Sequence, residues 1–160
     1  HACALVESLT PDILKLNLAS QEFITNEHVD TLVRRCNKIT ELDLSFTKIT
    51  NDSVESIMTH LNCLEKLNVG YTNIDFSTLL QLKSTPTLKS LQYGRFIRSK
   101  EGLKEDTEAI KKIKLQLPHI SINEGYTNIA RPTKCLNGSV DLDWFWEIKA
   151  KKQDLFRETY

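Results

Sequence analysis

The sequence predicts an α/β fold: a leucine-rich-repeat solenoid with short parallel strands on its concave face and helices on its convex face. The first observation is a motif of the form Leu-x-x-Leu-x-Leu. It occurs five times, at Ile13/Leu16/Leu18, Ile39/Leu42/Leu44, Leu64/Leu67/Val69, Leu88/Leu91/Tyr93 and Leu117/Ile120/Ile122. The second observation is the spacing, because the first positions (13, 39, 64, 88 and 117) are 26, 25, 24 and 29 residues apart. A nearly fixed step in this range is typical of stacked leucine-rich repeats, each a strand and a returning helix.

Each repeat is predicted to begin with a strand, because apolar and polar residues alternate there. Residues 41–44 read Glu, Leu, Asp and Leu, and residues 15–18 and 66–69 follow the same pattern. The leucines should face the interior, and the strands should pair in parallel because a helix returns the chain between them. The intervening polar residues should form a row on the open concave side, consisting of Asn17, Asp43, Asn68, Gln92 and Ser121.

The returning segments are predicted to be helices, because apolar residues recur three and four positions apart behind a helix-capping residue. The first helix has Asn26 as its cap and the apolar stripe Val29, Leu32, Val33 and Cys36. The second has Asn51 or Asp52 as its cap and the stripe Val54, Ile57, Met58 and Leu61. A shorter turn around 79–82 stops before Pro86, a fourth helix covers roughly 104–117, and residues 1–11 resemble the severed helix of a preceding repeat.

The composition narrows the class of function. Lys plus Arg and Asp plus Glu are both 21, so the formal net charge is zero, which argues against a nucleic-acid or acidic-membrane binder. No apolar run approaches the ~20 residues of a membrane-spanning helix. We expect one domain, divided into repeats over 1–123 and a tail over 124–160 that folds back along the concave face. The chain begins at His1, so we expect it to be a piece of a longer protein.

The four cysteines, Cys3, Cys36, Cys63 and Cys135, show no closely spaced disulfide framework. Cys36 and Cys63 lie at or just before the start of a repeat, where small buried residues belong. We therefore expect both to be buried and all four thiols to be free. Free thiols favour a location in the nucleus and cytoplasm.

No constellation of catalytic residues is visible. The histidines have no i, i+4 pair and there is no Cys-x-x-Cys, so we expect no metal site and no cofactor. Glu41 and Asp43 could imitate a catalytic carboxylate pair, but we interpret them as solvated strand residues without perturbed pKa values. We therefore expect a binding protein and not an enzyme.

Two segments depart from the repeat. The 94–102 loop carries Arg95 and Arg98, which make it either a solvated loop or a contact loop for an acidic partner. The tail is rich in aromatic residues and should pack on the concave face or on a partner.

Phe46 and Tyr71 follow strands at positions where the repeat needs no ring, so they either bind a partner or cover the edge of their own repeat. The candidate partner-binding residues are Phe46, Tyr71, Tyr126, Arg95, Arg98, Asp43, Asn68, Trp144 and Trp146.

Four stretches of the sequence resemble the S-phase kinase-associated protein two family of leucine-rich-repeat F-box proteins. They are Thr-Leu-Val-Arg-Arg-Cys at 31–36, Pro-Thr-Leu-Lys-Ser-Leu-Gln at 86–92, Leu-Pro-His-Ile-Ser-Ile-Asn at 117–123, and Ile-Ala-Arg-Pro-Thr at 129–133 followed by Trp-Glu-Ile-Lys at 146–149. The last stretch is the most specific because it is not a repeat motif. The resemblance extends from about residue 8 to residue 149.

The resemblance implies the substrate-recognition portion of a cullin–RING (SCF-type) ubiquitin ligase. In that family the repeats and tail bind a phosphorylated cell-cycle substrate together with a small cyclin-kinase-subunit accessory protein, which the position of Tyr126 would help to contact. An F-box, which is absent from this sequence, binds the ligase adaptor. At rim positions where vertebrate members carry charged residues, this chain has Glu22, Phe46 and Tyr71. A repeat scaffold or inhibitor outside any ubiquitin ligase is therefore the alternative interpretation.

Overall fold

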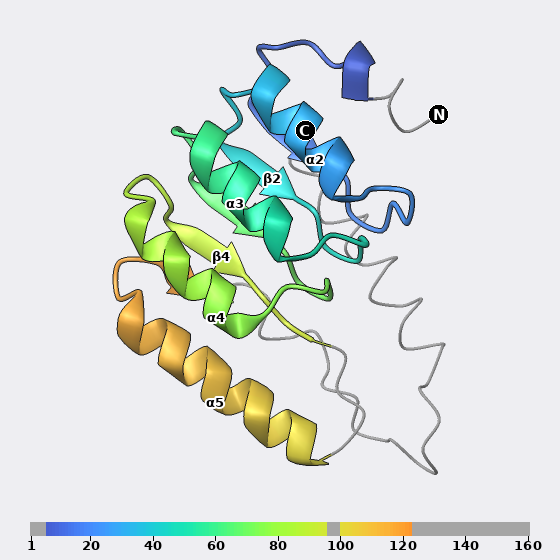
Figure 1. Ribbon diagram of the computed structural model, residues 1–160. Coiled ribbons are helices and arrows are strands. Elements are labelled where there is room, and N and C mark those ends of the chain that lie inside the picture. The colour runs from blue at the N-terminus through green and yellow to red at the C-terminus, as the bar shows by residue number, and fades with distance from the viewer. Residues whose placement is uncertain (1–5, 96–99, 123–160) are drawn as a thin grey trace, which may run out of the picture.

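The computed structural model describes residues 6–95 and 100–122, and this part of the chain has the predicted α/β architecture. Its strands pair in parallel and in chain order, β1-β2-β3-β4-β5. Their bounds are Lys15–Asn17 (β1), Glu41–Asp43 (β2), Lys66–Asn68 (β3), Ser90–Gln92 (β4) and Ser121–Ile122 (β5). Figure 1 shows the strands side by side behind a layer of helices.

The register of the first four strands follows the repeated motif. Leu16 pairs with Leu42, Leu42 with Leu67, and Leu67 with Leu91. Leu42, Leu67 and Leu91 are 2%, 1% and 0% exposed, so the prediction that the motif leucines face the interior is confirmed for β2, β3 and β4. The same residues that define the sequence repeat therefore form its core.

The predicted phase of the fifth repeat is wrong. Leu91 pairs with Ile122, and Ser90 with Ser121, whereas the motif alignment paired Gln92 with Ser121. The Leu117 amide donates to the Ile113 carbonyl, as the Leu61 amide donates to that of Ile57, so Leu117 belongs to the end of a helix. Measured from Leu91 to Ile122 in the strand register, the last step is 31 residues. The extra length lies in the last helix.

The helices form one layer and follow each other in the same order as the strands (Figure 1). They are α2 (Asn26–Arg35), α3 (Asn51–His60), α4 (Phe76–Leu79), which continues as a 3₁₀ helix η1 (Leu80–Ser84), and α5 (Lys100–Gln116). The predicted stripe of α2 is fully buried, and Ile113 and Leu117 are buried at the end of α5. Helix α5 begins four residues earlier than the pattern predicts. Residues 6–8 are helical, and residues 1–5 lie outside the described part.

The helix starts differ from the prediction by one residue, because Thr25 and Thr50 occupy the capping positions. The two asparagines are the first helical residues, and their side chains reach the next repeat instead. Asn26 Oδ1 accepts a hydrogen bond from the Thr50 amide at 2.9 Å, and Asn51 Oδ1 accepts one from the Asp75 amide at 2.8 Å. The sequence pattern does not separate a residue that caps its own helix from one that joins neighbouring repeats.

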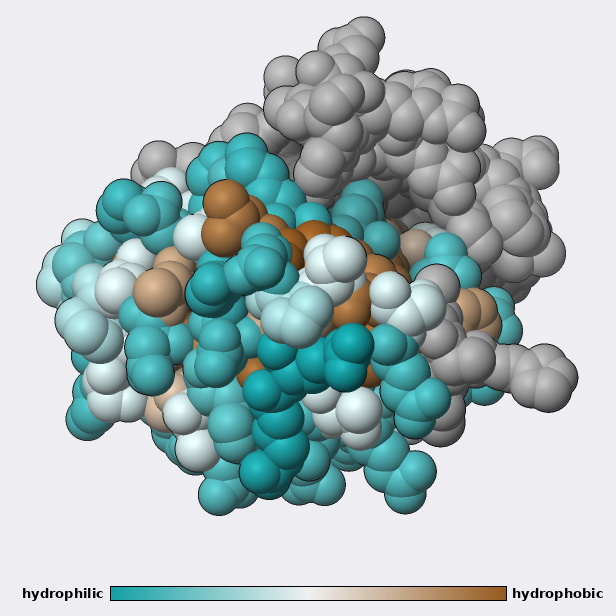
Figure 2. Space-filling model, turned by 90° about the horizontal axis from the view of Figure 1, so that it is seen from above, coloured by the Kyte–Doolittle hydropathy of each residue, from teal (hydrophilic) through white to brown (hydrophobic). Residues whose placement is uncertain are grey.

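The β1 end of the molecule is less buried than the middle. Leu14 is 54% exposed, and Ile13 and Leu16 are partly buried, whereas Ile39 and Leu64 are fully buried. Figure 2 looks onto this end and shows apolar side chains among polar ones. None of the described helices is long and apolar enough to cross a membrane.

The described cysteines differ from one another. Cys36 is buried and unpaired, as predicted, and burial raises the pKa of its thiol. Cys63 is exposed, so the prediction of a buried thiol there is wrong. The apolar position at this turn is filled by the neighbouring Leu64, which is fully buried. Cys3 and Cys135 lie outside the described residues.

Candidate functional site

The polar residue at the end of each of the first three strands turns back to close the loop that follows. Asn17 Oδ1 accepts a hydrogen bond from the Ala19 amide at 2.9 Å, Asp43 Oδ1 from the Ser45 amide at 2.8 Å, and Asn68 Oδ1 from the Gly70 amide at 3.0 Å. Such side-chain-to-backbone turns are a main use of Asn and Asp in loops. These three members of the polar row therefore have a structural role.

Asp43 and Asn68 were expected to be open to solvent, and this expectation is wrong. They are 3% and 5% exposed. Asp43 Oδ1 also accepts the Ser45 hydroxyl at 2.6 Å, and its Oδ2 accepts Asn68 Nδ2 at 2.8 Å. A buried carboxylate with three donors is satisfied and stabilises the turn, so neither residue offers a free binding group.

Glu41 behaves differently from Asp43, although both lie on β2. Its carboxylate bridges Lys15 at 3.1 Å and Lys66 at 3.0 Å, which lie on the two neighbouring strands. Partial burial acts to raise the pKa of Glu41, but hydrogen bonds and charges from Lys66 and Lys15 outweigh it and leave that pKa below its usual range. The two carboxylates are thus parts of separate structural contacts and do not form an acid–base pair.

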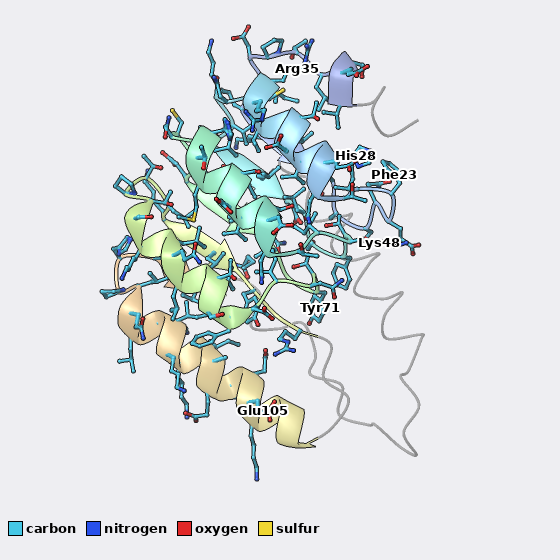
Figure 3. All side chains as sticks on the ribbon, in the orientation of Figure 1. Phe23, His28, Arg35, Lys48, Tyr71 and Glu105 are labelled. Atoms are coloured by element: carbon cyan, nitrogen blue, oxygen red, sulfur yellow. The ribbon has the colours of Figure 1, made fainter. Side chains whose placement is uncertain are left out.

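The loops that follow the strands, residues 18–25, 44–50, 69–75 and 93–95, form one edge of the molecule, called here the loop edge. Backbone bonds join them in order: the Ser20 amide donates to Ser45, the Phe46 amide to Gly70 and the Tyr71 amide to Gly94. In Figure 3 the labelled Phe23, Lys48 and Tyr71 lie along this edge, with His28 beside them. Phe23 is 47% exposed.

The rings of Phe46 and Tyr71 stack on each other at the loop edge. Their centroids are 4.6 Å apart and their planes differ by 12°. Both are partly buried, and both occupy equivalent positions of neighbouring repeats. Parallel strands lie about 4.8 Å apart, so side chains at equivalent positions are already at the distance of a stacked pair. The structure thus brings together two residues predicted for the site.

Both aromatic residues have left-handed backbone conformations. The φ angles are 59° at Phe46 and 59° at Tyr71, and the equivalent Ser20 has 63°. Such a conformation costs roughly 1–2 kcal/mol for a residue with a Cβ, and glycine or asparagine usually occupies it. Large rings at two successive positions of this kind are therefore unexpected from backbone preference alone.

A polar cluster of Tyr93, Arg95 and Asp106 lies next to Tyr71. Burial, followed by the charge of Asp106, raises the pKa of Tyr93 to about 12, and the charge of Arg95 offsets part of this effect. Burial also raises the pKa of Asp106, while Arg95 acts to lower it. Burial and the charge of Asp106 together raise the pKa of Tyr71. The charge of Asp106 on α5 therefore acts on both Tyr71 and Tyr93, which follow two neighbouring strands.

The structure assembles only part of the predicted site. Phe46, Tyr71 and Arg95 lie at the loop edge, and Asp43 and Asn68 lie beneath it as structural residues. Arg98, Tyr126, Trp144, Trp146 and the predicted path of the tail lie outside the described residues. Tyr93 and Asp106 are not among the site residues that the sequence predicts. Asp106 was detectable, because it precedes Ile110, Ile113 and Leu117 at helical spacing and so falls on the apolar face of α5.

Comparisons with known proteins assign no family. No protein-family model matches the chain. A solved structure titled "Leiomodin-1 Actin-Binding Site 2 (ABS2)" is similar over 99% of this chain and 91% of that chain, with 17% sequence identity and a TM-score of 0.46. In the described residues no group of three or more His, Cys, Asp or Glu side chains could hold a metal ion. Function is therefore inferred from the loop edge and from the sequence resemblance.

Proposed function

We propose that this chain is a protein-binding module, part of a leucine-rich-repeat solenoid whose loop edge receives a partner protein. The observation that carries this proposal is the stacked pair of Phe46 and Tyr71 in left-handed positions. Glycine would hold the same backbone without strain, so the rings have another use. Strained residues concentrate at ligand-binding places, and aromatic side chains are common anchors of protein interfaces.

The repeated contacts between successive loops and helices support the solenoid part of the proposal. The bonds from Ser20 to Ser45, Phe46 to Gly70 and Tyr71 to Gly94 recur at three successive steps, and the links from Asn26 and Asn51 at two. In a stack of this kind each repeat contacts its neighbours only, and the terminal repeats are less buried. The exposure of Leu14 at the β1 end agrees with that behaviour.

The biological role proposed for the module is substrate recognition in a cullin–RING ubiquitin ligase. Its support is the resemblance at 31–36, 86–92, 117–123, 129–133 and 146–149 to leucine-rich-repeat F-box proteins. The partners would be a phosphorylated protein substrate and a small cyclin-kinase-subunit accessory protein. The ligase adaptor would bind through an F-box outside this sequence. The module itself would be non-catalytic and would act in the nucleus and cytoplasm.

Affinity purification tests this role directly. The tagged full-length protein is isolated from cells after proteasome inhibition, and captured proteins are quantified by mass spectrometry. Tyr71→Ala should keep the ligase adaptor and cullin but lose the accessory protein or substrate. Leu115→Ala serves as the control, because Leu115 is 81% exposed on α5. Partners captured without adaptor or cullin would support the scaffold alternative, and undiminished capture by Tyr71→Ala would place the site elsewhere.

A further inference from the structure

The ion pairs of the described residues are distributed unevenly over the molecule. Some lie just before strands, one group joins three neighbouring strands, and others lie along the bodies of helices. They are Asp12–Lys38, Glu65–Lys89, Lys15–Glu41–Lys66, Asp30–Arg34 and Glu108–Lys111. No residue of the loop edge takes part in any of these pairs. The charges of the loop edge are therefore not balanced in the way that charges elsewhere on the surface are.

The loop edge and the helix starts that follow it carry more negative than positive charge. The exposed cations there are Lys48 and Arg95, and the exposed carboxylates are those of Glu22, Glu27, Asp52 and Asp75. Glu27 and Asp52 lie in the first turns of α2 and α3, where an acidic residue favours the helix dipole. This preference does not account for Glu22, which lies in the loop itself, and it does not require that the carboxylates lack ion pairs with described residues.

The contacts that two of these carboxylates make leave their charge uncompensated. Asp75 Oδ2 accepts a hydrogen bond from Asn51 Nδ2 at 2.9 Å, and Asp52 Oδ2 accepts one from Asn26 Nδ2 at 3.4 Å. Both donors are neutral amides. A surface with an excess of carboxylates attracts cations and repels a phosphate or another carboxylate.

Phe23 adds an apolar ring to the same surface. Its side chain is 47% exposed, it follows Glu22 in the sequence, and Figure 3 shows it on the loop edge. A guanidinium group is planar, stacks on aromatic faces and pairs with a carboxylate through several donors, whereas an ammonium group is a compact, strongly hydrated charge. An exposed ring next to uncompensated carboxylates therefore fits arginine better than lysine.

We infer that the partner presents a basic segment to the loop edge, with an arginine that lies on the ring of Phe23 and pairs with Glu22. The carboxylates of Glu27, Asp52 and Asp75 attract the further cations of this segment. The inference rests on the proposed function and adds the chemistry of the partner at the same surface. A phosphorylated side chain is repelled by these charges and has to bind elsewhere.

The test is an NMR titration of the full chain with the peptide N-acetyl-Arg-Ala-Arg-Ala-Arg-amide and with its lysine and glutamate counterparts. The arginine peptide should bind more tightly than the lysine peptide and much more tightly than the glutamate peptide, with shifts concentrated on the loop edge. Phe23→Ala should weaken binding of the arginine peptide about two- to fivefold, as expected for an exposed cation–π contact. Glu22→Lys should weaken it about fivefold, because it replaces an attraction by a repulsion.

Leu115→Ala and Glu105→Lys are the matched controls. Both residues are exposed on α5, and Figure 3 shows Glu105 well away from Phe23. Neither control should change the affinity for the arginine peptide appreciably. Equal losses in the variants and their controls, shifts spread over the whole surface, equal affinity for the arginine and lysine peptides, or tighter binding of the glutamate peptide would overturn the inference.

Capture of partners from cells separates this inference from the proposed function. If Tyr71→Ala abolishes capture of the accessory protein or substrate and Glu22→Lys preserves it, the loop edge binds its partner but does so without a basic segment. If both variants lose capture and only the controls keep it, the basic segment is supported together with the proposed function.

Discussion

The carboxylate of Asp43 accepts a hydrogen bond from Asn68 Nδ2 at 2.8 Å, so the end of one strand is tied to the end of the next by their side chains. Both residues are buried, and each also closes its own loop. A position expected to be a free surface residue is thus part of the framework that holds the loop edge in place.

Asp43→Ala should therefore be strongly destabilising. The change removes the acceptor of three hydrogen bonds and leaves the buried amide of Asn68 without a partner, which should cost about 2–4 kcal/mol of unfolding free energy. Urea unfolding measures the loss. Asp12→Ala is the control, because Asp12 makes an exposed ion pair with Lys38 and should not move the midpoint. Equal midpoints for both variants would contradict the buried role of Asp43.

The left-handed backbone at Phe46 predicts an unusual ranking of substitutions. Phe46→Gly removes the strain of roughly 1–2 kcal/mol together with a stacking contact worth about 0.5–1.5 kcal/mol, so the unfolding free energy should change little. Phe46→Val keeps the strain, loses the stack and should be clearly less stable. Phe23→Val controls for loss of a ring at an exposed position. If the unfolding free energy of Phe46→Val equalled or exceeded that of Phe46→Gly, the backbone at residue 46 would not be strained.

Tyr93 predicts a loss of stability in alkaline solution. Its pKa is raised from 10.0 to about 12 in the folded protein, first by burial. As the pH rises, Tyr93 therefore loses its phenolic proton in the unfolded chain before it does so in the folded protein. The unfolding free energy should consequently fall between about pH 10 and pH 12, by at most ~1.4 kcal/mol per pH unit. Below pH 10 this contribution is fully present. Unfolding followed across this range should show a shallower decline for Tyr93→Phe, and an identical decline would refute the assignment.

The two described thiols should differ in reactivity. Cys63 is exposed, whereas Cys36 is buried and burial raises its pKa, which lowers the fraction of reactive thiolate. A thiol reagent applied to the folded protein should label Cys63 well before Cys36, as located by peptide mass spectrometry. All four cysteines should react after denaturation without reductant, as expected for free thiols. Faster labelling of Cys36 would contradict its buried environment.

The strands and the interior could be predicted from the sequence because the leucine period itself reports which side chains are buried. The prediction failed in the fifth repeat because Leu117 and Ile120 fit the motif by spacing, while a longer α5 moves the strand later. Residues 121–123 read Ser-Ile-Asn, similar to Lys-Leu-Asn at 15–17 and 66–68, and this similarity carried the correct phase. A polar residue next to the core leucine was the better marker of the strand.

The site could be predicted only in part. The sequence identifies Phe46 and Tyr71 as rings without a role in the repeat. Their stacking, however, depends on the distance between strands, and their backbone strain depends on the φ angle. Neither quantity is visible in residue types, since Phe and Tyr disfavour left-handed backbone. Asp43 looked solvated because an acidic residue on an alternating strand is normally exposed. Its three donors come from a turn and a neighbouring strand that the linear pattern does not show.

The asparagines at the first turns of α2 and α3 have a consequence for motion. Asn26 is bonded to Thr50 and Ser53, and Asn51 to Asp75, so the start of each helix depends on the start of the next. A fluctuation that opens one helix start breaks bonds in the adjacent repeat as well. The loop edge from Thr25 to Asp75 should therefore open as one cooperative unit, with a single free energy of local unfolding shared by its amides. A partner that rearranges any one of these loops has to work against that whole unit.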